Sequence, residues 1–269
     1  MKKTFSIVFV LAALFGAVDL YAQYCGEFNA VTGVVEVEKS GSTQWAAVLK
    51  GLPVESGDRV RTANHSSCEV AIDDGSYLFI GEKTEATVDH MDAGSGKLEA
   101  HVSLWLGKLI AHIEKFRTTK MTVKTPVSVA SVRGTEFAVD TEKNESQVGV
   151  FEGKVQVNNA VADETSDEGS VAVEPDQQTT VAKDQHPAAP TRLSELMKKN
   201  KERLDGLRDR IKQRKEKLKR TPPDQLQAQR ARILERYQKL RTQLDHERDS
   251  IKKRNAQLKQ EVFYENEQK

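Results

Sequence analysis

The chain has 269 residues, of which 38% are hydrophobic, 30% are charged and only 6% are aromatic. This composition argues against one large enzyme domain with an apolar core, and it favours a modest core with much solvated surface. The formal charge of +1 is a cancellation, because residues 23–190 carry 15 Lys and Arg against 26 Asp and Glu, and residues 191–269 carry 24 against 13. Two modules of opposite charge, −11 and +11, are therefore predicted.

Residues 1–22 have the pattern of a secretory signal peptide. Two lysines precede an uncharged, mostly apolar run from Phe5 to Val18, and Ala22 is a small residue suitable for cleavage. The run of 14 residues is shorter than the roughly 20 that span a bilayer, which disfavours an uncleaved membrane anchor. We therefore expect a periplasmic or secreted protein.

The chain has two cysteines, Cys25 and Cys68. An oxidising compartment would let them form a disulfide that ties the mature N-terminus to a strand. The alternative is that Cys68, in phase with Val70 and Ile72, is a small buried residue and that Cys25 is a free thiol. No metal site is predicted, because the cysteines and the six histidines lack the spacing of zinc ligands.

Between residues 33 and 181 the chain repeats a turn glycine followed by a short alternation of β-branched and polar residues, which is the signature of strands. The segments are Gly33–Val37, Gly75–Ile80, Gly107–Ile113, Gly134–Val139, Gly153–Val157 and Gly169–Val173. The first two glycines are 42 residues apart and the last two are 16 apart, so no fixed-period repeat is present. We expect residues 23–184 to form an all-β domain of irregular coils or hairpins, solenoid-like or sandwich-like.

The predicted strand around residue 107 changes its phase. Apolar residues are even-numbered between 98 and 106 and odd-numbered between 109 and 113. A bend at Gly107, where a residue without Cβ relieves the steric barrier, would keep both halves facing the core. We therefore predict a bulge or corner at Gly107, and we expect a valine there to be strongly destabilising.

Strict alternation along Val127–Val139 would turn Arg133 toward the core. A buried arginine needs an acidic partner, because an unpaired buried ion is very costly. The candidate acids are Asp58, Asp73 and Asp74. Two alternatives stay open: Arg133 contacts a ligand, or Gly134 forms a bulge that turns Arg133 to solvent.

Several motifs of the acidic half occur in an order that is specific as a set. They are Gly33-Val34-Val35, Trp45, Gly57-Asp58-Arg59-Val60-Arg61-Thr62, Asp74-Gly75-Ser76, Leu106-Gly107-Lys108-Leu109, Lys124-Thr125-Pro126, Val132-Arg133-Gly134-Thr135-Glu136-Phe137 and Val150-Phe151-Glu152-Gly153-Lys154-Val155. Taken together from Gly33 to Val155, this set resembles the FecR domain. The resemblance implies an all-β, partly solenoid-like periplasmic module with a sensor or interaction role and no catalysis.

The chain departs from the full regulators of that family. Those proteins have a cytoplasmic segment and a transmembrane helix before the β module, whereas this chain opens with the predicted signal peptide. A direct anti-sigma role is therefore doubtful, and the resemblance carries over neither ligand-contacting residues nor iron-citrate binding.

Residues 185–190 are predicted to be a linker, and residues 191–269 a basic helical region. Apart from Pro222-Pro223 the helical region contains no proline, and Lys, Arg, Glu, Gln and Leu dominate it. Two heptad seams are predicted, with polar interruptions: Leu193, Met197, Asn200, Leu204, Leu207, Ile211, Arg214 and Leu218, and then Leu226, Arg230, Ile233, Tyr237, Leu240, Leu244, Glu247, Ile251, Arg254 and Leu258. We expect a two-helix hairpin or a coiled coil, with Thr221 capping the second helix.

The motifs of common enzyme sites are absent, and neither a catalytic residue nor a cofactor is predicted. The basic run either coats the helices or binds something anionic, and export makes nucleic acid an improbable partner. We predict a non-catalytic envelope protein that recognises a ligand or a protein, with specificity in the turns around Asp58, Asp74 and Arg133. The partners that fit are an envelope protein, an anionic lipid or cell-wall component, or the chain's own acidic module. The alternative is a scaffold that forms a homo-oligomer through residues 191–269.

Overall fold

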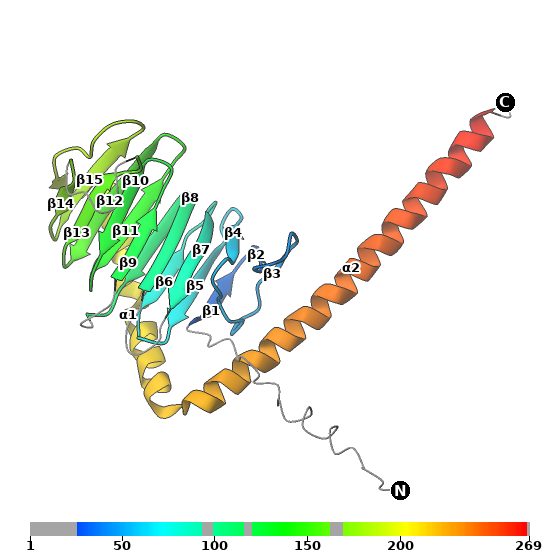
Figure 1. Cartoon of the computed structure of the whole chain (residues 1–269), viewed down its shortest axis with the longest axis horizontal. Helices are drawn as coiled ribbons and strands as arrows, with labels where there is room; N and C mark the ends of the chain where they lie inside the picture. The colour runs from blue at the N-terminus through cyan, green and yellow to red at the C-terminus, as the bar shows by residue number, and fades with distance from the viewer. Residues whose placement is uncertain (1–25, 93–98, 116–119, 162–168, 268–269) are drawn as a thin grey trace, which may run out of the picture.

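The computed structural model describes residues 26–92, 99–115, 120–161 and 169–267. Two β layers are followed by two C-terminal helices, α1 (Glu195–Arg220) and α2 (Pro223–Glu267), as Figure 1 shows. The predicted combination of a mainly β module and two helices is confirmed. The predicted signal peptide lies outside the described residues. No helix in the described part of the chain is long and apolar enough to cross a membrane.

The first layer, sheet A, contains only antiparallel pairs. Its strands, in spatial order, are β1 (Gly26–Thr32), β5 (Ser67–Ile72), β6 (Tyr77–Ile80), β8 (Glu99–His112), β11 (Glu136–Thr141), β12 (Glu145–Glu152), β15 (Gln177–Ala182) and β16 (Thr191–Arg192). The last of these extends the sheet two residues into the predicted helical region, so the β domain ends just before α1.

The second layer, sheet B, contains one parallel pair, β8 with β9, and is otherwise antiparallel. Its order is β3 (Trp45–Ala47), β2 (Val35–Glu38), β4 (Arg59–Thr62), β7 (Glu85–Asp92), β8, β9 (Lys120–Lys124), β10 (Ser128–Val132), β13 (Val155–Asn159) and β14 (Val171–Val173). Neither layer closes on itself. The arrangement is therefore an open, sandwich-like stack, with β8 common to both sheets.

Strand β8 changes sheets at Gly107, as the change of phase predicts. Residues up to Leu106 pair with β7 in sheet B, and residues from Gly107 onward pair with β11 in sheet A. Gly107 has a φ of +93°, and a Cβ at this position would lie 2.6 Å from the Cα of Thr84. A side chain is therefore excluded both by the backbone conformation and by the space available.

The main core lies between the two sheets and consists of the inward faces of both. A second apolar cluster lies on the other side of sheet A, where Tyr77, Phe79 and Ile110 contact α1. Strand β6 is buried at all four positions because both of its faces are covered, whereas β4 of sheet B alternates between buried and exposed residues. The molecule thus has three layers: sheet B, sheet A and α1.

The two helices do not form the hairpin that the seams suggested. Helix α1 lies along sheet A, and α2 starts at the lower end of α1, runs past β1, β2 and β3 and extends away from the β layers (Figure 1). The Thr221 hydroxyl donates to the carbonyl of Lys217, so Thr221 ends α1 and does not cap α2. The α1 seam packs on sheet A, and the first part of the α2 seam, including Ile233 and Tyr237, packs at the edge of the main core.

Candidate functional site at the interface of the helices and the β layers

Ser194 is the N-cap of helix α1, and its side chain accepts a hydrogen bond from the backbone N–H of Met197. Its buried residues are those of the predicted seam: Met197, Asn200, Leu204, Leu207, Ile211 and Arg214. They cover the apolar outer face of sheet A, so the helix is part of the folded core.

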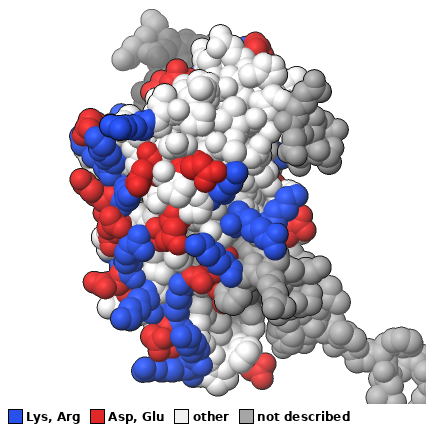
Figure 2. Space-filling view, turned by 90° about the vertical axis from the view of Figure 1, so that its left-hand side faces the viewer, with Lys and Arg blue, Asp and Glu red and all other residues white. Residues whose placement is uncertain are grey.

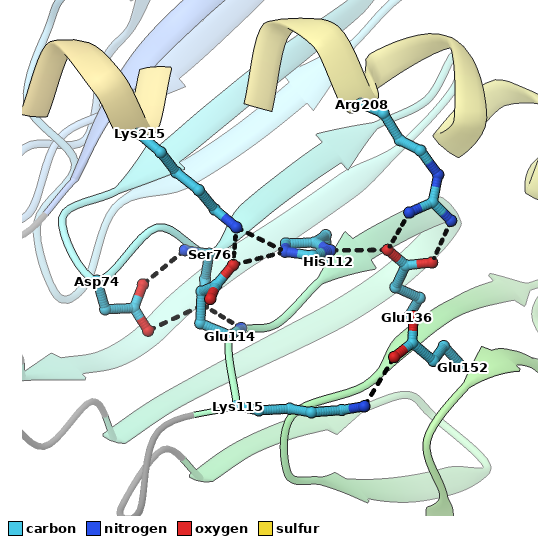
Figure 3. A network of polar contacts seen from close by, with 9 residues as sticks. All are labelled: Asp74, Ser76, His112, Glu114, Lys115, Glu136, Glu152, Arg208 and Lys215. Carbon is cyan, nitrogen blue, oxygen red and sulfur yellow. Dashed lines mark hydrogen bonds and ion pairs between the residues drawn. The ribbon is translucent and has the colours of Figure 1, made fainter. Parts of the chain in front are cut away.

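A polar network joins α1 to sheet A beside this apolar contact (Figure 3). Arg208 of α1 binds Glu136 with two hydrogen bonds, of 3.1 and 2.8 Å. His112 at the end of β8 lies between two carboxylates, with Nδ1 2.8 Å from Glu136 and Nε2 2.8 Å from Glu114. Lys215 of α1 also binds Glu114. The helix is thereby held by alternating cations and anions.

The electrostatics of this network favour its charged form. Burial by itself would lower the pKa of His112, but hydrogen bonds to Glu136 and Glu114 outweigh that effect, and the pKa is raised above its ordinary value. Burial by itself would raise the pKa of Glu114 and of Glu136, but Lys215, Arg208 and His112 reverse this and hold both pKa values below the ordinary one. The two opposite shifts both favour a protonated histidine between two ionised carboxylates.

This arrangement does not suit catalysis. Both ring nitrogens of His112 are engaged by carboxylates, so neither is available to take a proton from a substrate. Within the described ranges, no group of three or more His, Cys, Asp or Glu side chains is placed to hold a metal ion. The network is built to fix α1 on sheet A.

A second set of ion pairs joins α1 and α2 to the β layers near the junction of the two helices. Arg230 of α2 is completely buried and binds Asp73 through two hydrogen bonds, of 2.6 and 2.7 Å. Glu27 of β1 binds both Arg230, at 3.1 Å, and Arg214 of α1, at 2.9 Å. One carboxylate of the first strand therefore ties the two helices together. Both arginines occupy seam positions where the heptad pattern has polar interruptions.

Two of the predicted site residues, Asp58 and Asp74, make hydrogen bonds within the β layers. Asp58 is fully buried and binds Lys39 at 2.6 Å together with the backbone N–H groups of Ser40 and Glu55. Burial raises the pKa of Asp58 even though Lys39 acts in the opposite direction. Asp74 accepts hydrogen bonds from the backbone and the hydroxyl of Ser76, and burial raises its pKa too.

The prediction of a buried Arg133 is wrong. Strand β10 ends at Val132, and Arg133 is exposed in the bend that follows. Gly134, with a φ of +61°, lies in the same bend between β10 and β11, so the alternation ends there and the Arg133 side chain is solvent-exposed, the outcome that the sequence left open as an alternative. Asp58, Asp73 and Asp74 have the other partners described above. The structure does not bring Asp58, Asp74 and Arg133 together as one site, and Arg133 instead lines a shallow basic surface with Lys120 and Lys154.

Cys68 is a buried free thiol in β5, and burial raises its pKa well above the ordinary value. Cys25 lies outside the described residues. In the β1–β5 register Cys68 is opposite Val31, while Gly26 is opposite Ile72, about 13 Å further along the strand. The disulfide stays a prediction that this register does not favour.

Beyond Tyr237 the α2 seam leaves the β layers. Leu240, Leu244 and Ile251 are 40%, 49% and 57% exposed. On the face of the molecule shown in Figure 2, charged side chains of both signs lie intermixed, and no large area of one sign is visible. The candidate surfaces are therefore the exposed α2 stripe, which we define as Leu240, Leu244 and Ile251, and the contact region between the helices and sheet A.

Comparisons with known proteins find a family model that matches part of the chain. A model of the family described as FecR protein matches residues 58–156, which confirms the resemblance for this part of the chain. No curated protein sequence matches the chain.

Two crystal structures, at 1.65 and 2.50 Å resolution, are similar to this chain. Both are of a "putative anti-sigma factor" from Parabacteroides distasonis ATCC 8503, with 16% sequence identity and a TM-score of 0.40. The similarity covers 50% of this chain and 59% of that protein.

Proposed function

We propose that this FecR-domain protein is a non-catalytic recognition protein of the cell envelope. In this proposal the β layers and α1 form a rigid body, and α2 presents the binding surface for an envelope protein. The observation that carries it is the exposed α2 stripe, which continues a seam that is buried or half-buried as far as Tyr237. The FecR match supports a regulatory role without enzymatic activity, and the predicted signal peptide supports an envelope location.

A different protein fits the α2 stripe better than a second copy of this chain. The stripe has three apolar residues with Glu247 interrupting their heptad spacing, whereas a self-sufficient coiled coil needs apolar positions over three or four heptads. Docking into an apolar groove of another protein needs only a few anchors at helical spacing. Lys239, Arg241 and Asp245 flank the stripe with both signs of charge, which suits a protein surface of mixed charge better than a uniformly anionic polymer.

The proposal is tested by placing a photo-crosslinking residue at position 244 of the full chain and expressing the protein in its native host, so that its own cell envelope is present. We expect a crosslinked heterologous protein from position 244 and none from position 242, which lies about 200° away around the helix. The double variant L240E/L244E should abolish capture of that protein. The matched control Q238E/T242E adds the same charge on the opposite face and should retain capture. Equal capture by both variants would contradict the proposal.

The scaffold is the second candidate, because the 4-3 spacing of the α2 seam is that of coiled coils. Sedimentation equilibrium of the full mature chain separates the two candidates. A monomer that crosslinks to another protein supports recognition. A stable oligomer that L240E/L244E dissociates, and Q238E/T242E does not, supports the scaffold.

A further inference from the structure

A cavity of about 560 Å³ lies at the junction of α1, α2, β1 and the turn that follows β3. This volume is within the range of small-molecule sites. The described charged residues that line it are unbalanced in sign. Glu27 is the one carboxylate among them, and the cations are Lys50, Arg210, Arg214, Lys217 and Arg230. The cations come from three separate segments of the chain, so their convergence depends on the docking of both helices.

Arg214 lines this cavity and has hydrogen-bond donors without an acceptor. Its side chain is 5% exposed, and its Nη1 edge binds Glu27 at 2.9 Å. Its Nε and Nη2 atoms are buried and have no hydrogen-bond partner among the described residues. These two nitrogens share one edge of the planar guanidinium group, which is the edge that grips two oxygens of an oxyanion. A buried donor pair without an acceptor is costly, so an acceptor from outside the chain is expected to bind there.

The other cations leave a surplus of positive charge. Arg230 is neutralised by Asp73 and Glu27, and Arg210 binds Glu69 at 2.7 Å. Lys50 and Lys217 are exposed and make no ion pair with any described residue. The five cations that line the cavity pair with three carboxylates, which are Glu27, Glu69 and Asp73. The site therefore keeps a net charge of +2.

We infer that this cavity binds a phosphate monoester through the free edge of Arg214 and the ammonium groups of Lys50 and Lys217. A carboxylate has two oxygens, which the Arg214 edge alone would occupy. A phosphate monoester has three terminal oxygens and a charge of about −1.5 to −2 at pH 7, which matches the arginine edge, the two lysines and the surplus charge. The Arg214 nitrogens are covered from solvent, so the long side chains that line the cavity shift when the phosphate group enters.

This site goes beyond the proposed function and shares no residue with the α2 stripe. Because the ligand contacts α1 and the β3 turn beside the ion pairs of Arg230, binding also stabilises the angle at which α2 leaves the body. The two proposals fail separately, since capture by the stripe and phosphate binding are measured on different variants.

The probes are inorganic phosphate and glycerol 3-phosphate, titrated calorimetrically into the full mature chain, with sodium chloride and sodium succinate at matched ionic strength as references. We expect saturable binding of both phosphates and neither saturable heat nor added thermal stability with the references. The variant K50Q/K217Q should weaken phosphate binding at least about tenfold, because it removes two charge-assisted hydrogen bonds. The control K212Q/K253Q removes the same amount of charge from exposed positions of α1 and α2 that do not line the cavity, and it should bind as the parent does.

Arg214→Lys keeps the charge and loses the paired edge, so it should weaken binding about tenfold in a protein that still unfolds cooperatively. Vesicles containing phosphatidylglycerol test whether the phosphate belongs to a lipid, and we expect no cosedimentation above that with neutral vesicles. The inference is overturned if phosphate gives no saturable binding, if succinate binds as well as phosphate, if vesicles compete with glycerol 3-phosphate, or if K212Q/K253Q weakens binding as much as K50Q/K217Q.

Discussion

At the scale of single residues, Gly107 decides whether β8 can serve both sheets. Its φ of +93° costs a non-glycine residue about 1–3 kcal/mol, and a Cβ would in addition meet the Thr84 backbone at 2.6 Å. We expect Gly107→Val to lower the free energy of unfolding by about 4 kcal/mol or more, measured by urea denaturation. Gly41→Ala is the matched control, because Gly41 has a φ of +75° and nothing within 4 Å of its missing Cβ. If both variants lower the free energy of unfolding by the same amount, steric exclusion of a side chain at Gly107 is not the cause of the loss.

His112 makes the attachment of α1 dependent on pH. Because its pKa is raised in the folded protein, its stabilisation is complete below the ordinary histidine pKa of about 6.5 and is lost as the pH rises through the raised value. We expect His112→Gln to lower the free energy of unfolding by about 2 kcal/mol at pH 5.5 and by clearly less at pH 9. Urea denaturation across this range checks the expectation.

The matched control for His112 is His65→Gln, whose side chain is 95% exposed. The His65→Gln variant should change stability little at any pH.

The lowered pKa values of Glu114 and Glu136 act at the acidic end of the pH scale. Their contribution to stability is present above about pH 4.5 and is lost as the pH falls through the lowered values. A loss of stability in His112→Gln that does not vary with pH would mean that packing, and not charge, is what the histidine contributes.

The arginines show how much of the site could be predicted from the sequence. Arg214 and Arg230 fall on the helical seams and are buried. The helical period continues unbroken along each helix, so it identifies the buried positions even when they carry a charge. Arg133 was misplaced because the period of a strand is only two residues, and one glycine bend at Gly134 reverses every later assignment. Which acid a buried arginine meets depends on the packing of distant segments, and no local pattern contains that information.

At the scale of elements, the same seam pattern predicted which helix faces are apolar but not what covers them. The α1 seam is buried by sheet A, whose strand β6 is apolar at every position because it has a layer on each side. Pro222 and Pro223 separate the two helices, since neither proline can donate a backbone hydrogen bond to continue α1. Because the helices diverge after this break, they do not form the hairpin that two consecutive heptad seams suggested.

The two helices should therefore respond differently to the same substitution. Leu207 of α1 is 1% exposed and Leu244 of α2 is 49% exposed. We expect Leu207→Ala to lower the free energy of unfolding by about 3 kcal/mol, through lost burial and a cavity under the helix. Leu244→Ala, the matched control, should stay within about 0.5 kcal/mol of the parent. Similar small losses for both leucines in urea denaturation would show that α1 is not part of the core in solution.

At the scale of the whole molecule, the opposite charges of the two halves meet within one chain. Ion pairs join the helices to the β layers at Lys201–Asp176, Arg208–Glu136, Arg210–Glu69, Arg214–Glu27, Lys215–Glu114 and Arg230–Asp73. The hypothesis of intramolecular docking is therefore confirmed. The docking does not rest on long-range attraction alone, because Arg214 and Arg230 are buried in their ion pairs and α1 also buries an apolar face on sheet A.

Salt should consequently leave the shape of the molecule unchanged. Screening weakens exposed charge pairs but acts little on buried ones, and burial of apolar surface does not weaken as salt rises. Helix α2 has 45 residues and a length of about 68 Å, so its direction dominates the largest dimension of the particle. We expect small-angle X-ray scattering profiles of the monomer to coincide at about 50 mM and 500 mM sodium chloride, concentrations at which the Debye length falls from about 14 to 4 Å. An increase in the radius of gyration at the higher concentration would mean that exposed charges, and not the buried arginines, hold the helices on the β layers.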